Sequence, residues 1–158
     1  MAIRCASKAI ILIDGSVLLN RCKRADGTVY YDLPGGGQKV YENLEQAVIR
    51  EVKEATGYDV KVDRFVALVE EIYTNEELRK KYPEYTHRIL HIFKVDIIGD
   101  KKDSPIETDF QMEASVWIPL SNIEGIGETC PSCLKKILVN LGENNNPMYM
   151  GTEFRDWC

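Results

Sequence analysis

A glycine-rich turn followed by acidic residues at helical spacing is the part of this sequence whose residue types could do chemistry most directly. Residues 35–37 are all glycine, and the acidic residues that follow are Glu42, Glu45, Glu51 and Glu54. Consecutive glycines let the backbone approach a ligand closely, and their carbonyl oxygens are candidate metal ligands. Hard cations such as Mg²⁺ prefer oxygen ligands and are typically held by a few carboxylates together with substrate phosphates. The segment therefore predicts a divalent cation next to a phosphate group.

The acidic residues belong to the clearest helical segment of the chain, residues 43–56. Asn43 is a suitable N-cap, and Gln46 three residues later completes a capping box. Gly57 suits the position just after the C-terminus of the helix. A step of about 100° per residue gathers an apolar stripe that we expect to face the core. The members of this stripe are Leu44, Val48, Ile49 and Val52.

Glu51 and Glu54 fall together at one edge of the stripe, and two interpretations of them stay open. Carboxylates beside a buried face are unfavourable unless something compensates their charge. A divalent cation would compensate it, and Arg50 could orient one of the carboxylates. Alternatively, the residues form a solvated acidic face with Lys53 as partner, because runs of charge commonly lie in solvent.

The spacing of these residues resembles the signature of the Nudix hydrolases. That signature runs glycine, five residues, glutamate, seven residues, then Arg-Glu-apolar-x-Glu-Glu-x-Gly-apolar. The matching residues are Gly36, Glu42, Arg50, Glu51, Val52, Glu54, Gly57 and Tyr58. A match over so many fixed offsets is far more specific than a lone glycine motif. The resemblance implies an α+β fold, a Nudix-type αβα sandwich with a mixed β-sheet and a loop–helix–loop motif, as one domain over residues 1–158.

The resemblance also implies roles for single residues. Glu51 and Glu54 would be ligands of Mg²⁺ or Mn²⁺, and the neighbourhood of Gly36 would offer a carbonyl oxygen to the ion. Arg50 would hold the glutamates in place, and Glu42 would orient Arg50 or the loop. The expected reaction is hydrolysis of a pyrophosphate bond in a nucleoside diphosphate that is linked to another group.

One position departs from the signature in a way that bears on activity. Ala55 stands where the family usually has a second glutamate directly after Glu54. Residues 51 and 55 are one helical turn apart, and in many members these two side chains bind one ion together. The departure therefore keeps open a second interpretation, a Nudix-fold nucleotide-binding or regulatory module with weak or no catalysis. Tyr41, where glycine is common, is a smaller departure.

The general base is expected outside the helix, because family members often use a carboxylate from elsewhere in the chain. The loop before the Trp117 strand carries Glu107, Asp109 and Glu113. We expect Glu113 to be the base. The alternative is that this loop is simply acidic and solvated, as exposed loops commonly are.

Candidate substrate-binding residues lie on the predicted strands. Arg21 could bind phosphate oxygens through its planar guanidinium, although a solvated charge at a sheet edge is an equal alternative. Aromatic side chains could stack on a base, with core packing as the alternative; these are Tyr30, Tyr31, Tyr73 and Phe110. Among them we select Tyr73, and we add Gly36 because the backbone there can approach a ligand. His87 and Arg88 are further candidates for contact with substrate, with a structural role for His87 as the alternative.

Several strands must position these side chains. Apolar and aromatic runs predict strands over residues 3–13, 17–24, 29–33, 60–73, 87–98 and 115–118, with Asp14-Gly15 as a hairpin turn between the first two. Residues 75–81 have helical composition but end near Pro83, which indicates a surface excursion. Residues 99–104 are predicted to be a charged turn, and residues 130–141 an amphipathic helix. The tail from Gly142 onward has no clear pattern.

Composition narrows the classes of function. The chain has 158 residues and a net charge of −5, so no global basic field is present to attract a nucleic-acid polymer. The first residues do not resemble a signal peptide, and no apolar run is long enough to span a bilayer. We therefore expect a cytoplasmic enzyme that acts on a small nucleotide, without a membrane partner. Family members are often dimers, so a homodimer is expected as a candidate state.

The cysteines allow one unrelated interpretation. Cys130 and Cys133 form a CxxC pair near the predicted start of the last helix, and a helix N-terminus can lower the pKa of a thiol. The pair could therefore serve a redox reaction. The total of five cysteines is odd, which argues against a disulfide framework and favours ordinary reduced thiols.

Overall fold

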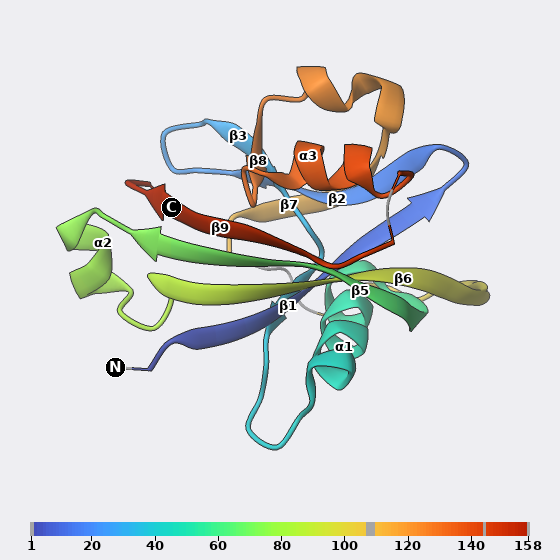
Figure 1. The fold of residues 1–158 in the computed structure, drawn as a ribbon, viewed down its shortest axis with the longest axis horizontal. Helices are drawn as coiled ribbons and strands as arrows, with labels where there is room; N and C mark the ends of the chain where they lie inside the picture. The colour runs from blue at the N-terminus through green and yellow to red at the C-terminus, as the bar shows by residue number, and fades with distance from the viewer. Residues whose placement is uncertain (1, 107–109, 144, 158) are drawn as a thin grey trace.

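A strongly twisted mixed sheet with helices on both of its faces forms the body of the molecule (Figure 1). The computed structural model describes residues 2–106, 110–143 and 145–157. Within them the strands are β1 (Arg4–Ile13), β2 (Ser16–Lys23), β3 (Val29–Asp32), β4 (Gly35–Gly37), β5 (Tyr58–Tyr73), β6 (His87–Lys102), β7 (Met112–Pro119), β8 (Glu128–Cys130) and β9 (Met148–Arg155). The helices are α1 (Leu44–Thr56), α2 (Glu76–Lys81), α3 (Leu134–Asn140) and a 3-10 helix, η1 (Leu120–Gly125).

Strand β1 is the centre of the sheet. The strand order is β8-β3-β2-β1-β6-β5-β9, while β4 pairs with β1 and β7 pairs with β2. β1 is parallel to β6 but antiparallel to β2 and β4. The expected mixed sheet of an α+β fold is therefore confirmed, and the pairing with β4 brings the glycine turn directly against β1.

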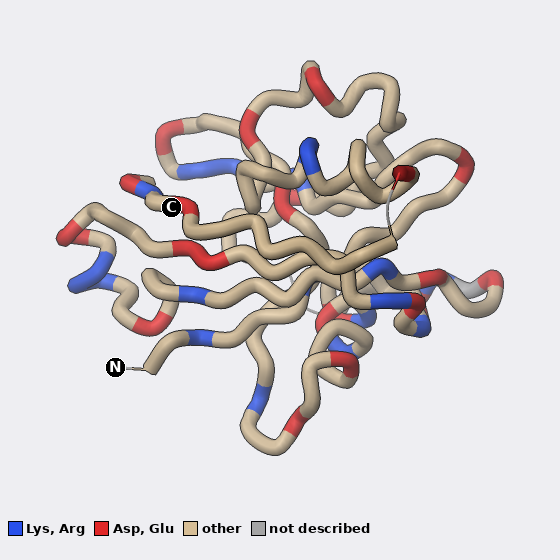
Figure 2. The backbone as a smooth tube through the Cα atoms, in the orientation of Figure 1, with Lys and Arg blue, Asp and Glu red and all other residues tan. Residues whose placement is uncertain are grey.

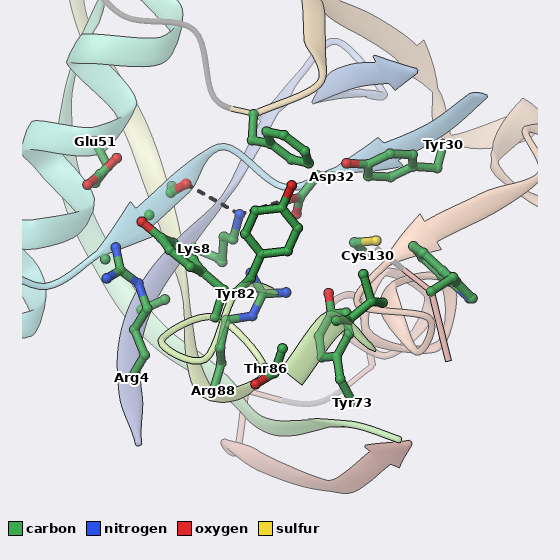
Figure 3. Close-up of a pocket in the computed structure, with 18 residues that line it drawn as sticks. Arg4, Lys8, Tyr30, Asp32, Glu51, Tyr73, Tyr82, Thr86, Arg88 and Cys130 are labelled. Carbon is green, nitrogen blue, oxygen red and sulfur yellow. Dashed lines mark hydrogen bonds and ion pairs between the residues drawn. The ribbon is translucent and has the colours of Figure 1, made fainter. Parts of the chain in front are cut away.

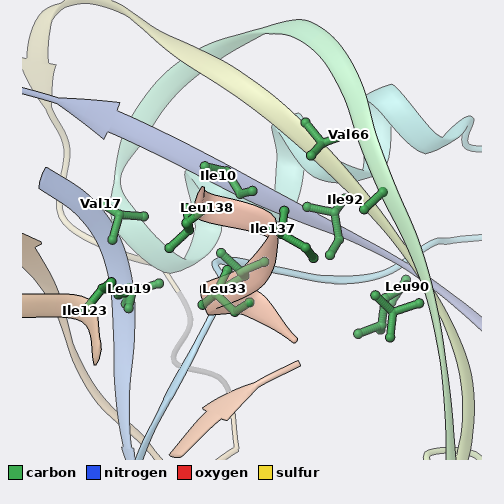
Figure 4. Packing of buried hydrophobic residues seen from close by; sticks show 14 residues of the cluster. Ile10, Val17, Leu19, Leu33, Val66, Leu90, Ile92, Ile123, Ile137 and Leu138 are labelled. Carbon is green, nitrogen blue, oxygen red and sulfur yellow. The ribbon is translucent and has the colours of Figure 1, made fainter. Parts of the chain in front are cut away.

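Alternation along β1 supplies two separate cores. Ala9 and Ile11 pack with Val48 of α1 on one face. Ile10 packs with Ile137 of α3 on the other face (Figure 4). Because helices cover both faces, the strand reads as a nearly continuous apolar run rather than as an alternating one.

Helix α1 has the capping residues that the sequence predicts. The Asn43 side chain accepts a hydrogen bond from the backbone of Gln46, and the Gln46 side chain accepts one from the backbone of Asn43, which is a capping box. Gly57 follows the helix with φ of 80°, in the left-handed region that favours glycine. The bounds of the helix are thus set by local signals.

The predicted apolar stripe of α1 is wrong at one position. Ile49 is 38% exposed. The buried side of the helix is completed instead by the small residues Ala47 and Ala55. Small side chains there let the helix approach the sheet closely, which turns Ile49 outward.

Two predictions in the middle of the chain need correction. The charged turn over residues 99–104 is wrong, because β6 continues to Lys102, which pairs with Tyr58 at the start of β5. The strand predicted over 115–118 is longer, since β7 pairs with β2 from Met112 to Pro119. Pairing between segments far apart in the sequence extends both strands beyond their local pattern.

The C-terminal part also differs from expectation. The last helix begins at Leu134 rather than at Cys130, because Cys130 ends β8 and pairs with Asp32 of β3. The tail without a clear pattern forms β9, which runs parallel to β5 at the edge of the sheet (Figure 1). β9 carries the chain end back toward the strands that surround the glycine turn.

Charged residues of both signs are interspersed along the described chain (Figure 2). Of the helices in the described residues, none has the length and apolar character needed to cross a membrane.

Candidate active site

Arg50 connects helix α1 to the preceding loop through several hydrogen bonds. Its Nη1 donates to Glu51 Oε1 at 2.7 Å and to Glu54 Oε2 at 2.9 Å. Its Nε and Nη2 donate to the two oxygens of Glu42 at 2.7 and 2.9 Å. Nη2 also donates to the carbonyl oxygen of Gly37 at 3.0 Å. One guanidinium therefore fixes three carboxylates and the glycine turn relative to each other.

This arrangement has a clear electrostatic consequence for Glu42. The hydrogen bonds from Arg50 lower the pKa of the Glu42 carboxyl to about 2, because they stabilise its charged form. The same carboxylates raise the pKa of Arg50 above its usual range. Both residues are therefore charged at neutral pH. The structure thus brings together four of the residues that the signature predicted.

Glu51 stands where the glycine turn meets a cavity of about 550 Å³. Both Glu51 and the three glycines of the turn line this cavity. A Cβ atom at position 36 would lie 2.4 Å from Glu51 Oε2. Only glycine at position 36 therefore lets the Glu51 carboxylate rest against the backbone of the turn. Figure 3 shows Glu51 at one end of the cavity.

Glu54 lies beside Glu51 but further from the cavity. Both carboxylates accept a hydrogen bond from the same Nη1 of Arg50, so they are adjacent. Lys39 Nζ is 4.0 Å from Glu54 Oε1. Glu45 is exposed in the first turn of the helix. The alternative of a solvated acidic face with Lys53 as partner does not fit Glu51, whose side chain is only 16% exposed, and Lys53 pairs with Asp59 and Asp103 instead.

The residues present suit the hard divalent cation that the resemblance implies. No group of three Asp, Glu, His or Cys side chains converges as a ready-made metal site within the described residues. Two adjacent carboxylates beside the backbone oxygens of a glycine turn nevertheless match Mg²⁺, which usually takes one or two carboxylates and completes its octahedral shell with substrate phosphates and water. Because residue 36 is glycine, the Glu51 carboxylate lies close to the backbone of the turn, as a site in which both bind one ion requires.

Ala55 has no side-chain atom that could bind an ion, and the structure places it in the helix–sheet contact. Its side chain is 4% exposed and belongs to the buried side of α1. Tyr41, the other departure from the signature, is exposed and has φ of 67°. It thus adopts the left-handed backbone region that favours the glycine common at this position.

Basic residues that sequence reasoning missed line the same cavity. Lys8 Nζ donates to Asp32 Oδ2 at 3.0 Å and to the carbonyl oxygen of Leu33 at 3.1 Å. Arg4, four residues before Lys8 on β1, also lines the cavity. A lysine inside the apolar run of β1 is the signal that could have found this wall, because a buried lysine is rare unless it is paired.

Aromatic side chains form much of the remaining wall. Tyr30, Tyr73 and Phe110 line the cavity, as does Trp157 from the C-terminal segment. The rings of Phe110 and Tyr82 are 6.0 Å apart. Figure 3 shows Tyr30 and Tyr73 on the side of the cavity away from Glu51. In contrast, Tyr31 packs against the core.

Other candidates lie elsewhere. Arg21 and Glu113 form an ion pair with each other between β2 and β7, and neither is among the described residues that line the cavity. His87 pairs with Glu70 at 2.9 Å. Arg88 does line the cavity and pairs with Glu71. Glu107 and Asp109 lie outside the described residues.

The CxxC pair has the wrong environment for thiol chemistry. Burial raises the pKa of Cys130 and of Cys133 to about 12. Both thiols are therefore protonated at neutral pH, whereas reactive cysteines need thiolate character. Arg155 Nη1 lies 3.0 Å from Cys130 Sγ. The guanidinium by itself lowers the pKa of the Cys130 thiol, but the effect of burial is larger, so the environment counts against the redox interpretation and favours a structural role.

Comparison with known proteins identifies the domain type. A family model described as the NUDIX domain matches residues 4–131. Three solved structures share the fold. A NUDIX hydrolase from Nitrosomonas europaea is 16% identical, with a TM-score of 0.67 and coverage of 90% of this chain and 92% of that one. A MutT protein from Bacillus halodurans is 20% identical, with a TM-score of 0.67 and coverage of 98% and 91%. An ADP-ribose pyrophosphatase from Streptococcus suis is 18% identical, with a TM-score of 0.59 and coverage of 96% and 100%. No curated protein matches the sequence.

Proposed function

The chain belongs to the Nudix family, and from this premise we propose that it hydrolyses the pyrophosphate bond of a nucleoside diphosphate linked to another group, using Mg²⁺ or Mn²⁺. The family acts on small nucleotide substrates, and the solved structures of similar fold include an ADP-ribose pyrophosphatase. Those identities are too low to transfer a particular substrate. The proposal is therefore limited to the type of bond.

The observation that carries the proposal is the position of Glu51 at the end of a cavity with basic and aromatic walls. Its volume of about 550 Å³ lies within the range of small-molecule sites, roughly 300–1,000 Å³. Arg4, Lys8 and Arg88 supply positive charge, which suits a diphosphate. The aromatic residues at the other side suit a planar group such as a base.

Glu51 and Glu54, with a backbone oxygen near Gly36, would hold the ion. When bound, it would neutralise phosphate charge and lower the pKa of a coordinated water. Arg50 keeps the two glutamates in place, since it donates to both. This arrangement explains why the signature joins an arginine to its glutamates.

We assign the general base to Glu51 rather than to Glu113. A base must come within hydrogen-bond reach of the proton that it accepts, and Glu113 is held by Arg21 away from the cavity wall. In the proposed step, the oxygen of water bonds to one phosphorus while the bridging P–O bond breaks. The water proton passes to Glu51, and the other phosphate leaves with the bridging oxygen.

The experiment is a substrate panel with two matched variants. Nucleotide sugars, ADP-ribose, dinucleoside polyphosphates and nucleoside triphosphates are incubated with Mg²⁺ or Mn²⁺, and the products are separated by ion exchange. Glu51→Gln is expected to lose about 100-fold or more in kcat, as removal of a general base typically does. Glu113→Gln is expected to lose much less. The reverse order of the two losses would refute the assignment, provided that circular dichroism shows both variants folded.

A nucleotide-binding module with weak or no catalysis is the second candidate, and the alanine at position 55 favours it. With alanine at this position, α1 brings one carboxylate fewer to the ion than is usual in the family. This candidate predicts that nucleotides raise the melting temperature while no substrate yields product at any metal concentration.

A homodimer likewise stays a prediction, which light scattering of the purified protein would test.

A further inference from the structure

Arg4 is a basic residue at the acidic end of the cavity. It opens β1, and it lines the cavity together with Gly36, Gly37 and Glu51. Figure 3 shows the side chains of Arg4 and Glu51 at the same end of the cavity. A group bound beside Glu51 would therefore also face the guanidinium of Arg4.

Two neighbours hold the guanidinium in this position. Arg4 Cζ lies 4.6 Å from the centre of the Tyr85 ring, a distance at which the cation is attracted to the ring face. On the other side, a Cβ atom at position 37 would lie 2.1 Å from Arg4 Nη2. The glycine at position 37 thus makes room for the guanidinium against the backbone of the turn.

Arg4 differs from the other basic residues of the cavity in its ion pairing. Lys8 is paired with Asp32, and Arg88 is paired with Glu71. Across residues 2–106, 110–143 and 145–157, the Arg4 guanidinium forms no ion pair with a carboxylate. Partly buried charges are normally paired. Because Arg4 has no carboxylate partner within the described part of the chain, its guanidinium marks a place that an anion would occupy favourably.

We propose that Arg4 is a phosphate-binding residue, whose guanidinium contacts the diphosphate next to the ion held by Glu51, and that Tyr85 is the residue that positions it. The proposal rests on the proposed function for the identity of the anion. A guanidinium presents parallel N–H groups that match two phosphate oxygens. Tyr85 comes from the excursion between β5 and β6, so this segment takes part in binding.

The test uses magnesium pyrophosphate as the probe and calorimetry as the measurement. Arg4→Gln is expected to weaken binding about 10- to 100-fold, the effect of losing one or two hydrogen bonds to a charged group. Arg4→Lys is expected to recover only part of this loss, because an ammonium lacks the planar fork. Arg64→Gln removes one positive charge from β5, where Arg64 pairs with Asp63, and is the control expected to bind like the wild type.

Three further variants keep the charge of Arg4 and are directed at its placement. Gly37→Ala is expected to weaken binding by a similar factor, because the new methyl group displaces the guanidinium. Tyr85→Leu is expected to weaken binding about threefold to tenfold, while Tyr85→Phe, which keeps the ring, restores most of the affinity. These variants test the proposal even where Arg4→Gln is poorly folded by circular dichroism.

The outcomes separate this inference from the proposed function. Unchanged pyrophosphate affinity in both Arg4→Gln and Gly37→Ala would overturn the role of Arg4, whether or not the wild type turns over a substrate. Failure of the wild type to bind pyrophosphate would overturn it as well. If the Arg4 variants lose binding but no substrate of the panel is cleaved, the role of Arg4 stands while hydrolysis fails.

Discussion

Arg50 and its carboxylate partners set the chemistry of the candidate site at the scale of single residues. Three acidic side chains lie close together there, and their mutual repulsion is offset by one guanidinium. Glu42 takes two of its hydrogen bonds and is held on the loop side of the helix. Glu51 is thereby left to face the cavity from a position that the fold has already fixed.

Glu42 predicts how the stability of the fold depends on pH. Its folded-state pKa, about 2, is depressed below its usual value of 4.5. The stabilisation is therefore present above pH 4.5 and is lost as pH falls toward 2, because protonation breaks the pair with Arg50. We expect Glu42→Gln to lower the free energy of unfolding by about 1 kcal/mol at pH 7 and to reduce the loss of stability that urea titrations measure between pH 4.5 and pH 2. An equal loss of stability with falling pH in the wild type and in Glu42→Gln would contradict this.

Ala55 predicts a metal-dependent change in stability. Because its side chain is buried, Ala55→Glu is expected to destabilise the fold by about 1–3 kcal/mol in EDTA, the cost of a poorly solvated polar group. Mn²⁺ is expected to recover this loss if the new carboxylate joins Glu51 around the ion. Thermal unfolding with and without Mn²⁺ measures both effects. The same Mn²⁺ shift in wild type and variant would mean that position 55 does not reach the ion.

At the scale of elements, the junction between α1 and β5 places the helix on the sheet. Gly57 has φ of 80°, and a Cβ atom there would lie 1.8 Å from the carbonyl oxygen of Asp103. The backbone nitrogen of Asp103 also donates to the carbonyl oxygen of Gly57 at 3.0 Å. The glycine is thus needed both for its conformation and for the close passage of the chain after β6.

A matched pair of glycines separates these two requirements. Gly99 has φ of 73°, but a Cβ atom added there would meet nothing within 4 Å among the described residues. We expect Gly99→Ala to cost about 1 kcal/mol from the backbone alone. Gly57→Ala is expected to cost about 2–4 kcal/mol, since the methyl group also meets backbone. Chemical denaturation of both variants gives the difference, and equal costs would show that the contact with Asp103 is unimportant.

Elements with local signals could be predicted, whereas those made by long-range pairing could not. The capping box at Asn43 and the left-handed Gly57 are read from neighbours in sequence, so the bounds of α1 follow directly. β9 pairs with β5 some 80 positions earlier in the chain, and no local sequence pattern predicts this pairing. Among site residues, Arg50 and Glu51 follow from fixed spacing. Arg4 and Lys8 do not, because only the pairing of β1 with β4 brings them to the glycine turn.

At the scale of the whole molecule, a buried ionic cluster joins three strands beside the cavity. Glu71 of β5 is fully buried and pairs with Arg88 of β6 and with Arg155 of β9, the latter at 2.8 Å. Arg155 is itself only 4% exposed. The cluster fastens the C-terminal strand and holds Arg88 at the cavity wall. The segment that lies beyond the matched NUDIX domain is thereby part of the site's support.

Arg155→Met is expected to destabilise the fold by about 3 kcal/mol, because it leaves the buried carboxylate with one partner instead of two. Arg64→Met, at a partly exposed position on β5, is the control and is expected to change stability by no more than about 0.5 kcal/mol. Urea unfolding followed by circular dichroism measures both. A cost for Arg155→Met as small as that of the control would mean that β9 is held by its backbone pairing alone.

The proposed ion lies between the glycine turn and α1. The measurement that tests it most directly is anomalous diffraction from crystals grown with Mn²⁺ and a nucleoside diphosphate. We predict an anomalous peak bonded to the Glu51 carboxylate, near Gly36 and Glu54, with diphosphate oxygens on the same ion. A nucleotide bound elsewhere, with Glu51 and Glu54 still bonded only to Arg50 and no ion between them, would contradict the account.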